Sequence, residues 1–471
     1  MTNSAVKKQS PVNIAVVGHA NTGKTSLIRT LLRDGEFGEI ADYAGTTRHV
    51  ESVFIQVNNI DVISLFDTPG IEDSIAFLEL WQSIKMPKNQ QSVLEKIRHF
   101  IELAEKDINF EQEVKVMKQA YQSDLLLYVI DTRLPYLGKF QDELELLTLL
   151  GKPLIPVLNF IQHDSENVAL WRQQLQLANL HAVVEYDTVA FTLEAEQRLY
   201  KKMQSLLEIR YEQFASVLQQ SEERFTARIQ SGIHSVADLV IDAATFRQKI
   251  PNSSEQSSET KVYETMHSQL RSREEYCIQE LLQSFGFTND DLNSEFLPIK
   301  NGKWERDLFD PQTLKEFGIK TSSGAAKGAF IGGGIDLMVG GITLGTTAAL
   351  GAAAGAIWGV ANRYGKAIWE TVSRIRYACI DEPTLELLYI RQMHLLHCLS
   401  RRGHATQEPL ELSQFANFQS DDSLKKWLPE LRRHPQWSNI ARSKTETFQH
   451  TNNERETFLQ NIKAQIDSLT Q

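Results

Sequence analysis

Cysteine is scarce in this sequence: there are three cysteines among 471 residues and no CxxC pair. This excludes a disulfide scaffold and a thiolate metal site, and it is typical of proteins in a reducing compartment. Basic residues are also in deficit, with 49 lysines and arginines against 60 acidic residues, a formal net charge of −11. A chain this acidic lacks the broad positive field that phosphate-backbone binding needs, and we recognise no nucleic-acid-binding module.

The N-terminus is polar over residues 1–9, and no apolar run long enough to be a signal peptide follows Lys7 and Lys8. We therefore expect residues 1–10 to be disordered and the protein to be cytoplasmic. Apolar residues make up 42% of the chain and charged residues 23%, so a buried core is expected.

Strand-like and helix-like stretches alternate over residues 11–210. The runs at 124–130 and 153–158 are almost wholly apolar, as in strands that are buried on both faces of a parallel sheet. This pattern predicts an α/β fold with a mostly parallel sheet. Its other strands are expected at 12–17, 50–57, 60–66 and, more weakly, 182–186.

Two regions depart from this alternation. Residues 71–123 have helical patterning, are far longer than a usual connection, and are predicted to be a helical insertion that breaks near Pro87. Residues 211–471 are predicted to form a mainly α-helical C-terminal domain, interrupted by a polar loop at 251–260.

Residues 18–25 read Gly-His-Ala-Asn-Thr-Gly-Lys-Thr, the GxxxxGK[ST] spacing of a phosphate-binding loop, and follow a strand and precede a helix. Glycines let the chain wrap an oxyanion with its N–H groups, and the helix N-terminus adds positive potential. Lys24 would reach the β- and γ-phosphates, and the Thr25 hydroxyl would bind Mg²⁺. The alternative is a glycine turn with an exposed lysine. The expected nucleotide-binding residues of this loop are Gly18, His19, Ala20, Asn21, Thr22, Gly23, Lys24, Thr25 and Ser26.

Two further motifs would complete the phosphate site. Asp67-Thr68-Pro69-Gly70 closes the strand at 60–66, so Asp67 could hold Mg²⁺ and the Gly70 amide could contact the γ-phosphate. Thr47 could bring a hydroxyl to Mg²⁺ and order its loop around a triphosphate, or it could belong to a flexible polar loop. We expect Lys24, Thr47 and Gly70 to be the catalytic residues, and Thr25, Thr47 and Asp67 to be the magnesium ligands.

The phosphate loop, the Gly-Thr-Thr-Arg segment ending at Arg48 and the Asp-Thr-Pro-Gly motif together resemble the TrmE–Era family of P-loop GTPases. The whole chain resembles a bacterial group in which this domain precedes an uncharacterised C-terminal domain with a glycine-rich stretch. The stretches that carry this likeness are Gly-His-x-Asn-Thr-Gly-Lys-Thr-Ser, Thr-Thr-Arg-His-Val, Asp-Thr-Pro-Gly-Ile-Glu-Asp, Pro-Val-Leu-Asn-Phe and Asp-Leu-Phe-Asp-Pro.

The resemblance implies binding of GTP and GDP and hydrolysis of GTP with Mg²⁺. Many GTPases place a water-orienting glutamine where this chain has Ile71. Some relatives use K⁺ held partly by the asparagine that corresponds to Asn21, usually with dimerisation across the nucleotide face. We therefore expect a possible K⁺ site at Asn21 and a possible homodimer.

The base-reading motif NKxD is altered to Asn159-Phe160-Ile161-Gln162. Asn159 is kept and is expected to bind the nucleotide, but the carboxylate that would accept hydrogen bonds from guanine is missing unless Asp164 replaces it. Discrimination against adenine should therefore weaken, since rejection depends on leaving polar groups unpaired. Guanine specificity is thus implied by the resemblance.

A glycine-rich segment at 328–360 contains Asp336 as its only charged residue, and 337–360 has no charge at all. Its length and small residues fit a re-entrant helical hairpin that turns near residues 340–341 and associates with the inner face of the cell membrane. Two tightly packed helices buried in a soluble domain are the alternative. We expect Asp336 to cap a helix or, less favourably, to be a buried charge.

The sequence therefore predicts a P-loop GTPase domain over 11–210, with the insertion at 71–123, and a helical domain over 211–471. Its function is predicted to be that of a nucleotide-dependent switch that acts through a membrane-associated helical domain. An RNA- or ribosome-associated GTPase and a nucleotide binder without turnover remain the alternatives.

Overall fold

A computed structural model describes the chain in segments and divides it into two compact units, with the division at Thr226 and Ala227. Residues 1–9 of the expected disordered N-terminus, Thr47 and Pro87 lie outside the described residues, whereas Ser10 is described and exposed. The described residues are 10–32, 50–85, 92–161, 165–188, 192–251, 256–287, 299–300, 303–304, 306–316, 319, 335–339, 342–343, 376–401, 423–440 and 453–470.

The first unit is built on a six-stranded sheet in the order β2-β3-β1-β4-β5-β6. The edge strand β2 is antiparallel to β3 and all other neighbours are parallel, which confirms the mostly parallel sheet. The strands are β1 (Val12–Val17), β2 (Glu51–Val57), β3 (Ile60–Asp67), β4 (Leu125–Asp131), β5 (Leu154–Asn159) and β6 (Val184–Glu185).

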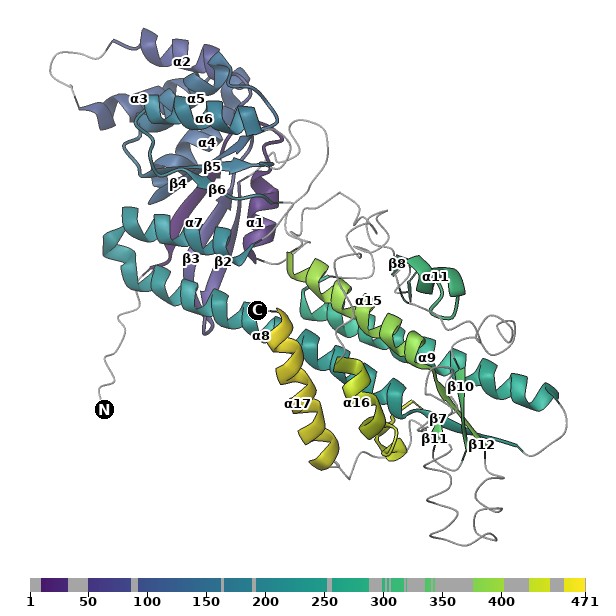
Figure 1. Ribbon diagram of the computed structural model, residues 1–471. Coiled ribbons are helices and arrows are strands. Elements are labelled where there is room, and N and C mark those ends of the chain that lie inside the picture. Colours follow the sequence, from purple (N-terminus) through teal and green to yellow (C-terminus); the bar gives the residue numbers. More distant parts are fainter. Residues whose placement is uncertain are drawn as a thin grey trace, which may run out of the picture. The chain divides into compact units, whose positions relative to one another are not determined.

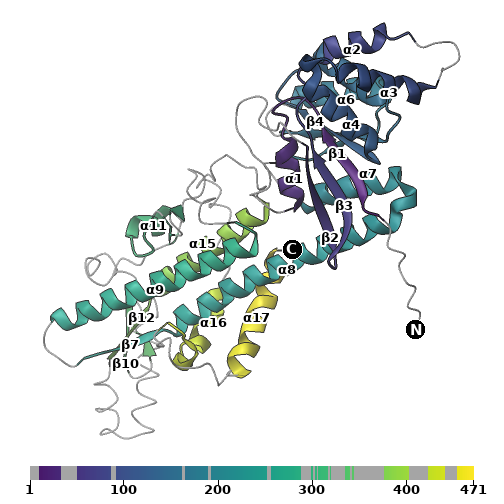
Figure 2. The same ribbon diagram turned by 180° about the vertical axis from the view of Figure 1, so that it is seen from behind.

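Helices cover both faces of this sheet, which lies between α7 and the group α3–α6 in both views (Figures 1 and 2). Alternate residues of β1 reach different cores, because successive strand side chains point to opposite faces: Ala15 and Val17 pack with α2–α6, whereas Ile14 and Val16 pack with α1 and α7. The helices are α1 (Lys24–Leu32), α2 (Ser74–Ser83), α3 (Val93–Ala104), α4 (Glu111–Gln122), α5 (Gly138–Thr148), α6 (Ser165–Leu177) and α7 (Leu193–Leu206), with short 3-10 turns η1 (Ile108–Phe110) and η2 (Glu208–Arg210).

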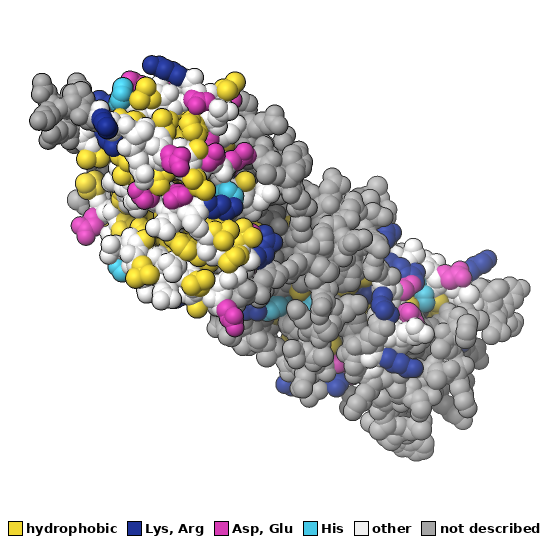
Figure 3. All heavy atoms as spheres, turned by 90° about the horizontal axis from the view of Figure 1, so that it is seen from above, with side chains coloured by type: hydrophobic (Ala, Val, Ile, Leu, Met, Phe, Trp, Pro, Cys, Tyr) yellow, Lys and Arg dark blue, Asp and Glu magenta, His cyan; other side chains and the backbone are white. Residues whose placement is uncertain are grey.

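The expected helical insertion is present as α2, α3 and α4. Aromatic side chains join these helices: the Phe77 ring on α2 lies 4.6 Å from that of Phe100 on α3 and 5.2 Å from that of Phe110. The inner faces of the three helices belong to the same core as β4 and β5, so the insertion is part of the domain. On the face in Figure 3, described hydrophobic, acidic and basic side chains are interspersed over this unit.

The second unit contains three long helices, α8, α9 and α15, that lie side by side (Figures 1 and 2). At Gly232 on α8 an added Cβ would lie 2.4 Å from Leu396 on α15 and 3.3 Å from Leu281 on α9, so the helices approach closely there. The helices are α8 (Tyr211–Thr245), which begins in the first unit, α9 (Gln256–Ser284), α11 (Pro311–Glu316), α15 (Glu382–Arg401), α16 (Ser423–Leu431) and α17 (Asn453–Thr470), with a 3-10 turn η4 (Pro435–Trp437).

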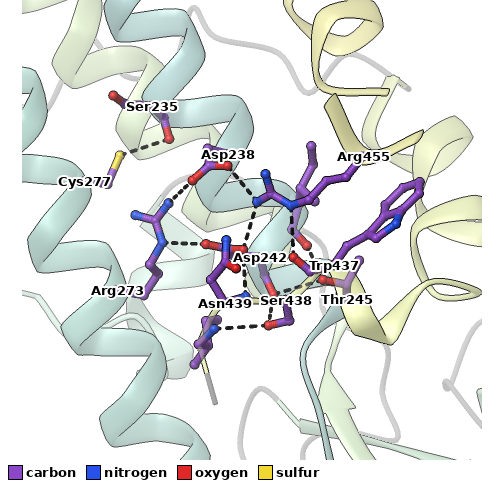
Figure 4. A network of polar contacts seen from close by, with 12 residues as sticks. Ser235, Asp238, Asp242, Thr245, Arg273, Cys277, Trp437, Ser438, Asn439 and Arg455 are labelled. Carbon is purple, nitrogen blue, oxygen red and sulfur yellow. Dashed lines mark hydrogen bonds and ion pairs between the residues drawn. The ribbon is translucent and has the colours of Figure 1, made fainter. Parts of the chain in front are cut away.

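A buried charge network joins α8, α9 and α17 (Figure 4). Arg273 on α9 donates to Asp242 at 2.7 Å and to Asp238 at 2.6 Å, and Arg455 on α17 donates to the same two carboxylates at 3.0 and 2.7 Å. Asp242 is fully buried, and burial raises its pKa against the opposing effect of Arg273 and Arg455. The two carboxylates and two guanidinium groups balance in charge, as a buried network requires.

The second unit also contains a four-stranded antiparallel sheet in the order β11-β10-β12-β7, in regions that were expected to be helical. Its strands are β7 (Arg247–Ile250), β10 (Ile335–Val339), β11 (Ile342–Thr343) and β12 (Arg376–Ile380), and a separate pair is formed by β8 (Ile299–Lys300) and β9 (Lys303–Trp304).

The helical hairpin expected at 328–360 is therefore wrong for its described part. β10 pairs with β11 and with β12, and Asp336 lies opposite Cys379 in a strand, so it does not cap a helix. The other residues of the segment lie outside the described part of the chain. None of the helices that the structure describes is long and apolar enough to cross a bilayer.

Candidate nucleotide-binding site

The phosphate loop connects the C-terminal end of β1 to the first residue of α1, as predicted. Gly18 and Gly23 adopt φ angles of +147° and +92°, which are accessible to glycine at little cost. A Cβ at Gly18 would lie 2.5 Å from the Val129 carbonyl oxygen, and one at Gly23 would lie 2.4 Å from Asn159 Nδ2. Only glycine fits both positions, so the two glycines of the motif follow from local geometry.

Lys24 folds back across the loop that it follows. Its Nζ donates to the carbonyl oxygen of His19 at 2.7 Å and to that of Gly18 at 3.3 Å. Burial lowers the pKa of Lys24, against the opposing effect of the charges of Asp67 and Glu143. The ammonium group is thus held at the loop in a place where an anionic ligand would favour its charged form.

Thr25 and Asp67 come together as the sequence predicted. The Thr25 hydroxyl donates to Asp67 Oδ2 at 2.5 Å, and the other carboxylate oxygen, Oδ1, is buried without a hydrogen-bond partner among the described residues. Burial raises the pKa of Asp67 to about 6, although the Thr25 hydrogen bond and Lys24 oppose this. A hydroxyl and an orphaned carboxylate oxygen suit a hard cation, so these residues fit Mg²⁺.

The remaining residues of the loop differ in exposure. Asn21 is exposed and has a φ of +61°, whereas the Thr22 hydroxyl donates to the His19 carbonyl oxygen at 3.1 Å. Ser26 lies in α1, where its carbonyl oxygen accepts from Thr30.

Gly70 lies directly on the phosphate loop. A Cβ at this position would be 2.7 Å from both the N and the Cα atoms of Ala20. The next residue, Ile71, donates its N–H to the Gly18 carbonyl oxygen at 3.2 Å, and its side chain is buried. The structure therefore brings the Asp-Thr-Pro-Gly motif to the loop, as predicted.

Asn159 links the loop to the ends of two strands. Its Nδ2 donates to the Thr22 carbonyl oxygen at 2.9 Å, and its Oδ1 accepts from Thr188 N at 3.0 Å, from Thr188 Oγ1 at 3.1 Å and from Phe160 N at 3.0 Å. The asparagine therefore organises this edge of the site from within the protein. Asp164, the suggested replacement carboxylate, lies outside the described residues.

Phe160, which occupies the family's lysine position, has a φ of +58° and lies beside the loop, since its Cζ is 3.5 Å from a Cβ built at Gly23. The Arg133 guanidinium stacks on its ring at 3.9 Å from the centroid. Asp131 orients this guanidinium by accepting from Nε at 3.0 Å and from Nη2 at 2.8 Å. No sequence motif marks this pair, because β4 and β5 bring Arg133 and Phe160 together only in the folded sheet.

A second group that no sequence motif marks surrounds the His19 side chain. Glu143 on α5 is fully buried and accepts from the Tyr128 hydroxyl at 2.8 Å, and it lies 2.9 Å from His19 Nδ1. Lys139 Nζ lies 2.8 Å from His19 Nε2. Since a charged lysine can only donate, this geometry assigns the Nδ1–H tautomer to His19. The one polar group in the run 125–130, the hydroxyl of Tyr128, is the sequence signal that could have indicated a buried partner here.

A phosphate loop that Lys24 folds back across, a Thr25–Asp67 pair suited to hold a cation, and Gly70 against the loop define the class of P-loop GTPases. Residues 13–160 match the family model described as "50S ribosome-binding GTPase". Residues 172–463 match the family described as "Domain of unknown function (DUF3482)". That match spans more than half of the chain, and the chain belongs to this family.

Similar proteins cover the GTPase part of the chain. GTPase Der of a Nitratiruptor species is 26% identical over 163 residues, which are 34% of this chain and 27% of that protein. The tRNA modification GTPase MnmE of Enterococcus faecalis is 32% identical over 111 residues, 23% of each chain. The chain thus spans about a quarter of the length of these curated relatives.

Two solved structures share low overall similarity with the chain. Aquifex aeolicus Era bound to GDP and AlF4− is 22% identical, with a TM-score of 0.28 over 38% of this chain and 52% of that one. The G domain of the T. maritima FeoB iron transporter is 20% identical, with a TM-score of 0.24 over 44% of this chain and 99% of that one.

Proposed function

We propose that the chain binds GTP and GDP at residues 18–25 and hydrolyses GTP to GDP and phosphate. The observation that carries this proposal is the buried triad of Lys24, Thr25 and Asp67 at the mouth of a glycine loop. The loop amides and Lys24 would hold the phosphates, and the Gly70 amide would donate to the γ-phosphate. Thr25, Asp67 and the expected ligand Thr47 would hold Mg²⁺, which when bound neutralises charge on the β- and γ-phosphates.

We propose that base selection depends on the strand ends around Asn159 and on the ring of Phe160. Aromatic stacking on a base is tolerant of base identity. With Gln162 in the position of the usual carboxylate, we expect GTP to be preferred over ATP by a smaller factor than a complete NKxD motif would give. Competition of fluorescent GDP by GTP, ITP and ATP measures this preference.

The attacking water has no glutamine partner in this proposal, because Ile71 is apolar and buried. We propose that K⁺ near Asn21 supplies the missing charge, with dimerisation across the nucleotide face as its companion. Phosphate release in KCl should exceed that in NaCl at equal ionic strength. Equal rates would remove K⁺ from the proposal but leave GTP hydrolysis intact.

The replacement Lys24→Ala tests the central claim. It removes the point charge at the loop, and we expect the fold to remain, because the hydrogen bonds of the ammonium group among the described residues go to two carbonyl oxygens of the loop itself. We expect triphosphate affinity to fall at least tenfold, about 1.4 kcal/mol, and phosphate release to be lost. Lys115→Ala on α4, whose partner is the exposed Glu111, is the matched surface control. Unchanged affinity in Lys24→Ala would refute the proposal.

We propose that the nucleotide state acts on the helical second unit, and two cellular roles follow from the sequence and the relatives. Membrane association through 328–360 predicts that the protein pellets with membranes and is released when this segment is deleted. A ribosome-linked role, which the description of the matching family favours, predicts co-sedimentation with ribosomal particles that depends on GTP. Fractionation of one cell extract separates these outcomes.

A further inference from the structure

The sensor segment, which we define as residues 70–73, lies between the phosphate loop and the helical insertion. Its first half is held on the loop: Gly70 abuts Ala20, and Ile71 donates its N–H to the Gly18 carbonyl oxygen at 3.2 Å. Ile71 also forms a parallel bridge with His19. The first half of the segment is therefore anchored on the phosphate loop itself.

The second half is held by one carboxylate of the insertion. Glu113 Oε1 accepts from Glu72 N at 2.9 Å and from Asp73 N at 3.0 Å. Hydrogen bonds to an ionised acceptor are about twice as strong as neutral ones. The Asp73 side chain then caps α2 by accepting from Ala76 N at 3.0 Å. Glu113 thus orders two successive backbone amides and, through Asp73, the N-terminus of α2.

Helix α4, which carries Glu113, is anchored to the sheet. Glu113 is 2% exposed, and the buried side chains of Met117 and Ala120 on the same helix belong to the core of the sheet. Just beyond the helix, Asp124 donates its N–H to the Asn13 carbonyl oxygen at 2.7 Å, and its Oδ2 accepts from Asn13 N at 2.9 Å. These bonds tie the end of α4 to β1, the strand that carries the phosphate loop.

We infer that Glu113 is the positioning residue through which the insertion orders the γ-phosphate sensor. By fixing residues 72 and 73 it holds Gly70 at the loop, so that the Gly70 amide is ready to donate to a γ-phosphate. The inference rests on the proposed function, and it assigns the long insertion a role in that site. Glu113 therefore strengthens the binding of a triphosphate and not of a diphosphate, because GDP lacks the γ-phosphate that the Gly70 amide would contact.

The test compares affinities of the full chain for GDP and for GTPγS. In Glu113→Ala we expect GTPγS binding to weaken about tenfold, in line with the loss of bonds to a charged acceptor, and GDP binding to change less than about twofold. Glu113→Gln keeps a neutral acceptor, so its GTPγS binding should weaken by about threefold. Glu72 and Asp73 lie at the surface, and Glu113→Gln keeps an acceptor for their amides, so we expect the fold to persist in that variant.

The matched control is Glu111→Gln, which changes an exposed carboxylate two residues earlier on α4 and should alter neither affinity. A general loosening of the site would weaken both nucleotides equally in the Glu113 variants, and that result overturns the inference, as does no change in either. If Glu113→Ala does not fold, Glu113→Gln decides the question. Wild-type protein that binds neither nucleotide would instead refute the proposed function, and this inference with it.

Discussion

Replacing Asn159 with alanine removes four hydrogen bonds from a side chain that is fully buried. One is donated to the Thr22 carbonyl oxygen, and three are accepted from Thr188 and Phe160. A typical net loss is about 1 kcal/mol for each bond, and a buried group left without a partner costs about 1–3 kcal/mol. Because Thr22 and Thr188 are buried, we expect Asn159→Ala to lower the free energy of unfolding of the first unit by about 4 kcal/mol.

Urea unfolding of the full chain provides the measurement, and the transition of the first unit is the one that GDP shifts to higher urea concentration. GDP affinity should fall as well, since Asn159 Nδ2 supports the loop at Thr22. Asn167→Ala is the control, because the hydrogen bond that its amide donates to the Arg133 carbonyl oxygen is long, at 3.5 Å, and exposed. A loss of less than about 0.5 kcal/mol, typical of surface substitutions, together with unchanged GDP affinity would refute this account of Asn159.

Two further predictions concern the second unit. Asp242→Ala leaves two largely buried guanidinium groups with Asp238 as their remaining shared carboxylate, so thermal unfolding should show a loss of about 3 kcal/mol, and Asp238→Ala, at a more exposed carboxylate, should cost less. Burial lowers the pKa of His394 to about 4, from its ordinary value of 6.5. As the pH falls below 6.5, His394 therefore takes up a proton in the unfolded chain before it does so in the folded chain, and the free energy of unfolding decreases. Between pH 6.5 and 4 the wild type should therefore lose about 3 kcal/mol more than His394→Gln, and parallel pH profiles of the two proteins would contradict this.

Much of the first unit could be predicted because its signals are local. The apolar runs that became β4 and β5 are buried throughout, and the phosphate loop is a contiguous motif whose glycines are required by backbone angles and close approach. The pairing of Thr25 with Asp67 could also be predicted from the sequence, because parallel strands such as β1 and β3 bring their C-terminal ends to the same edge of a sheet.

The second unit was predicted less well, because its pattern is not periodic. β12 and β7 are short strands that pair across more than a hundred residues, and their stability comes from that pairing. Helix α15 is buried around most of its circumference, so its true extent does not show as an amphipathic stripe. In such regions residue type alone does not distinguish a strand from a helix.

The sequence by itself determined the chemistry of the site: a loop that can wrap an anion, a lysine, a hydroxyl and a carboxylate at fixed spacing. Only the tertiary structure decided what surrounds these groups. Glu113 meets the sensor segment from 40 residues away and Glu143 meets His19 from 124 residues away. Such contacts arise from packing of whole helices against the sheet, and no local pattern of residues encodes them.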